Sequence, residues 1–161
     1  MYLEGRAIQP GTGHEAGRQL LADMYLRYAG VPMPEILVTE RGKPYFAKSD
    51  WHFSVSHTKN HVFCALSQKN IGMDAEEEDR AISLKLAEKI LSAEEYARYT
   101  AAEDQRIALL TFWVLKEAQA KLTGEGIKFH PTHTNFSLDD PGVTKIQGCL
   151  VAVIEEDDYV I

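Results

Sequence analysis

The first long segment of the chain has apolar residues at steps of three and four. Between residues 13 and 29, Leu20, Leu21 and Met24 fall on one face of a helix, and polar residues occupy much of the other. Gly30 follows the last periodic residue, a position where glycine commonly ends a helix. The pattern therefore predicts an amphipathic helix over residues 13–29.

Shorter apolar runs separated by turn residues follow this helix. Residues 51–55 alternate between apolar and polar side chains, and residues 62–66 form a continuous apolar run of strand length. Glycine and proline within residues 41–44 mark a turn. We expect strands over residues 34–39, 51–55, 62–66 and 71–76.

The second part of the chain is richer in helical signals. Ser92 and Glu95 have the spacing of a capping box, in which both side chains accept hydrogen bonds from free backbone amides at a helix N-terminus. Strands paired mostly antiparallel, with helices packed on one face, fit the order of elements and predict an α+β fold. We expect helices over residues 84–90, 92–99 and 103–122, then strands over residues 136–138 and 145–155, the last as one arm of a hairpin.

Composition sets bounds on the class of protein. The 161 residues are 45% hydrophobic and 25% charged, which is typical of a globular chain and not of a disordered one. The formal net charge of −7 argues against non-specific nucleic-acid binding, which requires a basic face. No apolar run approaches the roughly 20 residues that span a bilayer, and no signal-peptide pattern opens the chain. We expect a cytoplasmic protein that binds neither nucleic acid nor membrane.

Two carboxylates stand at alternate positions of the predicted strand over residues 71–76. Because side chains two apart on a strand point to the same face, Asp74 and Glu76 lie side by side there. Like charges at that spacing repel unless a cation or a proton separates them, and Mg²⁺ is a hard cation that seeks oxygen ligands. The pair also belongs to the acidic run of residues 74–79, so a solvated acidic surface is the alternative.

A row of side chains follows the longest predicted helix at four-residue spacing. Trp113, Glu117 and Lys121 lie along one side of it. Glu117 could complete a cation site with the strand carboxylates, and Lys121 could meet phosphate oxygens or a leaving group. An ion pair between Glu117 and Lys121 within the helix explains the same spacing without a site.

A Ser-His element and a basic turn supply candidate anion contacts in the first half. The hydroxyl of Ser56 and a ring N–H of His57 can both donate to phosphate. Arg41 and Lys43 flank Gly42, which permits the close approach of a ligand. A surface histidine and solvated basic side chains are the plainer interpretations.

The spacing of cysteine and histidine does not indicate a metal site. Cys64 and Cys149 lie in separate apolar runs, so we expect buried free thiols. They form no CxxC pair and cannot build a zinc site by themselves. His57 and His61 stand four apart across a predicted loop without fixed helical spacing, and we do not expect zinc there.

Four motifs in this order resemble the 4′-phosphopantetheinyl transferase superfamily, in particular its pseudo-dimeric, surfactin-synthetase-activating type. Each motif is weak alone, whereas four in the correct order over residues 13–154 are specific. The short branch of the superfamily opens almost at the Gly-x-Asp motif, and about 70 residues precede that motif here. The motifs are Gly42-Lys43-Pro44, Phe53-Ser-Val-Ser-His57, Ile71-Gly-Met-Asp-Ala-Glu76, and Phe112-Trp-Val-Leu-Lys-Glu-Ala-Gln-Ala-Lys121 followed by Gly124-Glu-Gly126.

The resemblance implies two similar small α/β halves related by a pseudo-twofold axis. Residues 1–69 would form the N-terminal half, and residues 70–161 would form the half that carries the metal-binding motifs. Coenzyme A would lie between the halves. Its phosphates would be held by Lys43, Ser56 and His57, together with Lys121 from the second half.

The same resemblance implies the chemistry. Asp74, Glu76 and Glu117 would hold Mg²⁺ on the pyrophosphate of coenzyme A, and Mn²⁺ stays open because it takes the same oxygen ligands. A serine of an acyl or peptidyl carrier protein would attack the phosphorus that bears pantetheine and release 3′,5′-ADP. Glu117 is the implied base, directly or through a water. Lys121 would neutralise the leaving group or protonate it.

Two other functions would use the same residues. A different Mg²⁺-dependent phosphodiesterase would attack with water, and a binding module would hold coenzyme A or a carrier protein without turnover. We expect a monomer. Because carrier proteins are usually acidic and the net charge here is negative, their recognition would need a local apolar patch, for which residues 82–91 and 97–101 are candidates.

Overall fold

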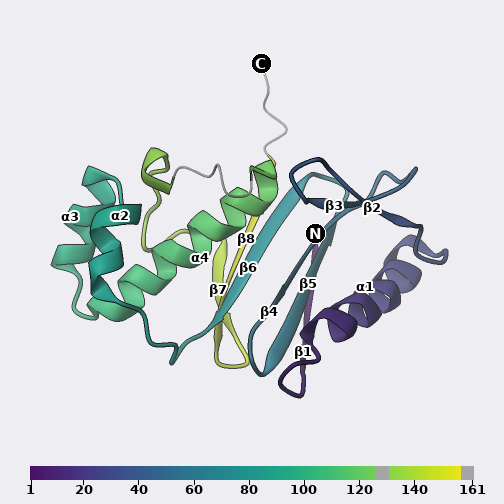
Figure 1. The fold of residues 1–161 in the computed structure, drawn as a ribbon, viewed down its shortest axis with the longest axis horizontal. Helices are drawn as coiled ribbons and strands as arrows, with labels where there is room; N and C mark the ends of the chain where they lie inside the picture. Colours follow the sequence, from purple (N-terminus) through teal and green to yellow (C-terminus); the bar gives the residue numbers. More distant parts are fainter. Residues whose placement is uncertain (126–130, 157–161) are drawn as a thin grey trace.

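The computed structural model describes residues 1–125 and 131–156. Within these residues, three antiparallel sheets and four α-helices form an α+β fold, which confirms the fold class predicted from the sequence (Figure 1). None of the helices in this described part is long and apolar enough to cross a membrane.

The first sheet has the strand order β1-β5-β4. Helix α1 packs against it through buried leucine and methionine side chains, and its bounds match the predicted ones. Strand β1 was not expected from the sequence. The elements are β1 (Tyr2–Ala7), α1 (Gly13–Ala29), β4 (His52–His57) and β5 (His61–Ser67).

A small two-stranded sheet follows α1 in the chain. Strand β2 (Ile36–Val38) pairs with β3 (Pro44–Phe46), and the basic turn over residues 41–44 connects them. The expected strand over residues 34–39 is therefore shorter than predicted. Pairing with β3 fixes the position of the turn.

The second large sheet has the order β6-β8-β7, with α4 (Gln105–Thr123) packed on it. Its strands are β6 (Ile71–Glu77), β7 (Val143–Ile146) and β8 (Cys149–Glu155). The segment over residues 145–155, expected as one strand, turns after β7. The turn residues have positive φ angles, as a tight hairpin requires.

Short helices pack against the N-terminal half of α4 (Figure 1). They are the 3₁₀ turn at Leu84–Leu86, α2 (Ala87–Ile90), α3 (Ala93–Ala101) and the 3₁₀ turn at Pro131–His133. The capping box predicted at the start of α3 is present with both of its hydrogen bonds.

The strand expected over residues 136–138 is absent, so that prediction was wrong. The backbone N–H of Phe136 donates to the Glu95 carboxylate at 2.7 Å, and its carbonyl accepts from Arg98 at 2.8 Å. Side chains therefore satisfy the backbone groups that a neighbouring strand would otherwise pair.

The two large sheets meet where β4 lies beside β6 (Figure 1). The hydroxyl of Ser54 accepts a hydrogen bond from the backbone N–H of Met73, and that of Ser56 accepts one from Ala75, at 3.0 and 3.1 Å. Serine side chains thus join the sheets. A division into halves at residues 69 and 70, and a twofold relation between them, stay predictions.

Candidate active site

Strand β6 and helix α4 approach so closely that only glycine fits between them. A Cβ atom on Gly72 would lie 2.1 Å from the carbonyl oxygen of Ala118 and 2.4 Å from the backbone nitrogen of Leu122. Asp74 and Glu76 share this face of β6, because they follow Gly72 at steps of two. The contact therefore brings both carboxylates against the helix.

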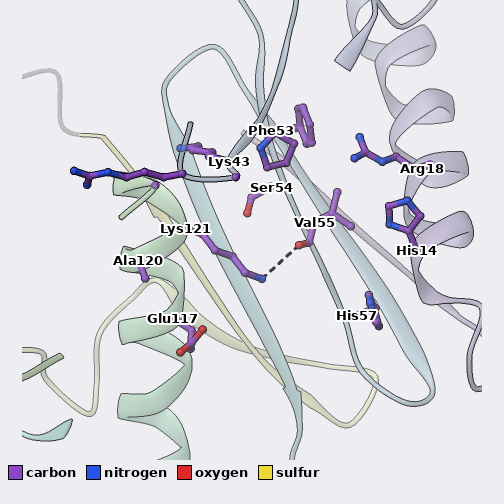
Figure 2. A pocket seen from close by; sticks show the side chains of 14 residues that line it. His14, Arg18, Lys43, Phe53, Ser54, Val55, His57, Glu117, Ala120 and Lys121 are labelled. Carbon is purple, nitrogen blue, oxygen red and sulfur yellow. Dashed lines mark hydrogen bonds between the residues drawn. The ribbon is translucent and has the colours of Figure 1, made fainter. Parts of the chain in front are cut away.

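Helix α4 contributes a carboxylate and an ammonium group one turn apart. Glu117 and Lys121 both line the cleft described below. The Lys121 ammonium lies 3.4 Å from the carbonyl oxygen of Val55 (Figure 2). It also lies 3.3 Å from Asp74 Oδ1. Among the described residues, Lys121 therefore pairs with Asp74 of β6 and not with Glu117 of its own helix.

The three carboxylates influence one another electrostatically. Burial, followed by the negative charge of Asp74, raises the pKa of Glu76 and also that of Glu117. The positive charge of Lys121 acts on both groups in the opposite direction. Carboxyl groups destabilised in their charged form by mutual repulsion are stabilised by a divalent cation.

The carboxylate oxygens of Asp74, Glu76 and Glu117 do not lie as close to one another as the ligands of a single metal ion. Arg80 donates to Glu76 at 2.5 Å, and Lys121 occupies one oxygen of Asp74. In the described part of the chain, only one set of three potential metal ligands lies within 4.8 Å, and it lies elsewhere.

One carboxylate oxygen of Asp74 lacks a hydrogen-bond partner in the part of the chain that the structure describes. Oδ1 accepts from the Ser56 hydroxyl at 3.1 Å, whereas Oδ2 is buried and makes no hydrogen bond to a described residue. Leaving a buried acceptor unsatisfied costs about 1–3 kcal/mol. Together with the raised pKa values of Glu76 and Glu117, this oxygen fits Mg²⁺, which takes oxygen ligands. Ser56 orients Asp74 instead of lining the cleft.

A cleft of about 460 Å³ lies between α1, the basic turn, β4 and α4 (Figure 2). Its charged lining is mainly basic, although the whole chain carries a net charge of −7. A local concentration of cations suits a ligand that carries phosphate groups. The basic lining residues are His14, Arg18, Arg41, Lys43, His57 and Lys121, and Glu117 is the acidic one.

Two cleft residues were missed by sequence reasoning. His14 and Arg18 lie one turn apart on α1, a spacing that could have marked them as a pair. Nη1 of Arg18 is buried and has no hydrogen-bond partner in the described part of the chain. Helix α1 comes close because Gly13 lies against His57, where a Cβ would be 2.4 Å from the ring.

Lys43 is held in place by two acceptors. Its ammonium donates to Asn70 Oδ1 and to the carbonyl oxygen of Leu122, both at 2.7 Å. Burial lowers the pKa of Lys43. The contacts fasten the basic turn to the C-terminal end of α4. Among residues 1–125 and 131–156, they leave one of the three ammonium hydrogens available to a ligand.

Lys116, which precedes Glu117 in the sequence, has a structural role in the core. Its side chain is fully buried, and its ammonium donates to Glu95 at 2.6 Å, to the Pro131 carbonyl and to Thr134. Neighbours in the helix thus face different surroundings: Glu117 faces the cleft, and Lys116 fastens α3 and residues 131–134 to α4.

The basic lining of the cleft suits a phosphate-bearing ligand, and the carboxylates beside it suit a divalent cation. Residues 70–159 match the 4′-phosphopantetheinyl transferase superfamily, and the chain belongs to this family. The family suggested by the four sequence motifs is thereby confirmed.

Relatives carry the corresponding name. The chain is 33% identical to the 4′-phosphopantetheinyl transferase psf-1 of Bacillus pumilus over 138 residues, which are 80% of this chain and 59% of that protein. It is 31% identical to the transferase Sfp of Bacillus subtilis strain 168 over 111 residues, covering 67% and 49%. It is 34% identical to the transferase AcpT of Escherichia coli K12 over 125 residues, covering 74% and 64%. The chain thus matches about half to two thirds of each relative.

Proposed function

We propose that the chain transfers the 4′-phosphopantetheine group of coenzyme A to a serine of an acyl or peptidyl carrier protein. The observation that carries the proposal is the buried Asp74 oxygen that lacks a hydrogen-bond partner within residues 1–125 and 131–156. This oxygen shares the β6–α4 junction with Glu76 and Glu117. This acidic cluster adjoins a basic cleft, into which Glu117 reaches. The names of the relatives support the same activity.

Coenzyme A matches the charge of the cleft. It carries a pyrophosphate and a further phosphate on its ribose, and such groups favour arginine, lysine and histidine donors. Arg18 and Lys43, which each keep a donor without a partner among the described residues, would hold the nucleotide phosphates together with His57. Ser56 would act on the substrate indirectly, by fixing the direction of Asp74.

The reaction exchanges one P–O bond for another. The serine oxygen bonds to the phosphorus that bears pantetheine, the bond from this phosphorus to the bridging oxygen breaks, and 3′,5′-ADP leaves. Such a transfer depends mainly on positioning and on neutralising charge. Mg²⁺ or Mn²⁺, held by Asp74, Glu76 and Glu117, would neutralise the pyrophosphate when bound.

Two residues of α4 would handle the proton and the leaving group. Burial and the charge of Asp74 raise the pKa of Glu117, which makes its carboxylate a stronger acceptor for the serine proton. The Lys121 ammonium, which is only partly buried and points between β4 and β6, would neutralise the departing oxygen.

The direct test is the intact mass of an apo carrier protein after incubation with the chain, coenzyme A and Mg²⁺. The proposal expects a gain of one phosphopantetheine group on a serine. Glu76→Gln should abolish the gain, whereas Glu78→Gln should retain it, because Glu78 pairs with Lys145 on the surface. A carrier protein that gains no mass under any of these conditions would contradict the proposal.

The same samples distinguish the two alternatives. Cleavage of coenzyme A without modification of the carrier would indicate a phosphodiesterase that attacks with water. Binding of coenzyme A in a calorimeter without any cleavage would indicate a binding module. A monomeric state and a cytoplasmic location stay predictions, which sedimentation and cell fractionation would test.

A further inference from the structure

A second group of side chains of metal-ligand type lies on the opposite face of β6 from the acidic cluster. Glu77 is the last residue of β6 and stands directly opposite Cys149, the first residue of β8. His61, the first residue of β5, completes the group from the other large sheet. Because successive strand residues point to opposite faces, Glu77 and its neighbour Glu76 serve different sites.

Two of the three contacts between these side chains already have the spacing of zinc ligands. Cys149 Sγ lies 3.6 Å from His61 Nδ1 and 3.5 Å from Glu77 Oε2, and His61 Nδ1 lies 3.0 Å from Glu77 Oε1. Ligands placed about 2.0–2.3 Å from a tetrahedral Zn²⁺ lie roughly 3.3–3.7 Å from one another. Small side-chain adjustments would therefore admit the ion.

The surroundings orient these ligands and leave an approach from solvent. Thr58 Oγ1 donates to Glu77 Oε1 at 2.6 Å, a supporting contact of the kind that commonly fixes metal ligands. Cys149 is fully buried, whereas the side chains of His61 and Glu77 are 17% and 19% exposed. A fourth position is thus open to water.

The ligand chemistry sets the preferred ion and its pH dependence. Burial and the negative charge of Glu77 raise the pKa of Cys149 to about 12, so a proton competes with a metal ion for this thiolate. Binding of a divalent cation would therefore release this proton. The sulfur and nitrogen donors select a borderline-soft ion such as Zn²⁺ over Mg²⁺.

We propose that His61, Glu77 and Cys149 form a Zn²⁺ site, distinct from the oxygen-ligand site at Asp74, that clamps the first large sheet to the second. The clamp would act at the start of β5, where side-chain contacts and not a backbone ladder hold the described parts of the sheets together. The site goes beyond the proposed transfer reaction and does not depend on it.

The test uses the full chain, reduced and freed of metal by a chelator, with Co²⁺ and Zn²⁺ as probes. Co²⁺ should produce thiolate charge-transfer absorption, and Zn²⁺ should remove this absorption while excess Mg²⁺ should not. With Zn²⁺ at 100 times its Kd, the Tm should rise by about 5–10 °C.

Matched variants locate the signal. Cys149→Ala should lose the thiolate absorption, whereas Cys64→Ala, which removes the other buried thiol, should keep it. His61→Gln leaves both thiols in place and should weaken Zn²⁺ binding by more than the roughly 10–100-fold expected for Thr58→Val, which removes a supporting contact.

Three results would overturn the proposal: absence of the thiolate absorption in the wild-type chain, its survival in Cys149→Ala, or its loss in Cys64→Ala. If Cys149→Ala fails to fold, the measurement on His61→Gln decides, since unchanged affinity there also overturns the site. None of these readouts requires transfer activity, so failure of this site and failure of the proposed function are distinguishable.

Discussion

Replacing Gly72 with alanine tests whether the close contact between β6 and α4 builds the active site. The new Cβ would lie 2.1 Å from the Ala118 carbonyl oxygen, whereas ordinary contact begins at 3.4 Å. Because the obstructing atoms belong to the helix backbone, α4 must retreat by about 1 Å, which carries Glu117 away from Asp74.

The magnitude of the effect follows from two general costs. Overpacking of this kind lowers the free energy of unfolding by about 1–3 kcal/mol. A displacement of about 1 Å between groups that must cooperate can lower a rate about 100-fold. We therefore expect Gly72→Ala to fold less stably and to transfer phosphopantetheine about 100-fold more slowly.

Gly5→Ala is the matched control. A Cβ at Gly5 would lie 2.4 Å from the Phe63 ring, a comparable clash in the core on the other side of the sheets. It should cost stability while retaining the transfer rate of the folded protein. Urea unfolding and initial rates measured by intact mass report the two quantities separately. Wild-type stability and rate for Gly72→Ala, or an equal loss of rate in both variants, would refute the reasoning.

Four further predictions concern charge. Folding raises the pKa of Glu117 above the ordinary 4.5, so the metal-free folded chain binds a proton there more tightly than the unfolded chain does. Its free energy of unfolding should therefore fall as the pH rises through the interval above 4.5. Mg²⁺ or Glu117→Gln should reduce this fall in urea titrations. Lys116→Met should destabilise the fold by about 3–5 kcal/mol, because it leaves Glu95 buried and unpaired, and adding Glu95→Gln should recover part of that loss in the same assay. Arg18→Met should weaken coenzyme A binding by calorimetry, whereas Arg27→Met on the exposed part of α1 should not. Association with an acidic carrier protein should accelerate as salt is added, because screening relieves the repulsion from the −7 charge, and slower association would contradict an apolar docking patch.

Hydrophobic periodicity predicted the long helices well, because the burial of one helix face largely determines where apolar residues fall along the chain. Helix α1 begins and ends as the apolar pattern indicates, and α4 differs by about two residues at its start. Strands β1 and β3 were missed because their pairing partners, not their own alternation, define them. The expected strand around Phe136 failed because the Glu95 and Arg98 side chains satisfy its backbone.

The sequence located the acidic residues but not their present partners. The alternation of Asp74 and Glu76 placed them correctly on one face, since strand periodicity is a local property. Local patterns could not show that Ser56 binds Asp74 or that the Lys43 ammonium is held by Asn70 and the end of α4, because these contacts join distant segments.

The proposed zinc site could not be predicted from the sequence, because its residues lie far apart in the chain. Cys149 and His61 are 88 residues apart in the chain, and no spacing motif connects them. Only the pairing of β6 with β8 and the contact between the sheets bring them to Glu77. Sequence reasoning considered zinc only for the His57 and His61 pair and for the two cysteines, and it did not bring His61, Glu77 and Cys149 together.

The most direct test of the central claim is the affinity of coenzyme A measured with and without Mg²⁺. If Asp74, Glu76 and Glu117 hold the cation beside the pyrophosphate, Mg²⁺ should tighten coenzyme A binding by at least about fivefold, within the usual range of coupling between two ligands. This gain should vanish in Glu76→Gln and persist in Glu78→Gln. An equal Mg²⁺ effect in both variants, or no effect in the wild-type chain, would contradict the account.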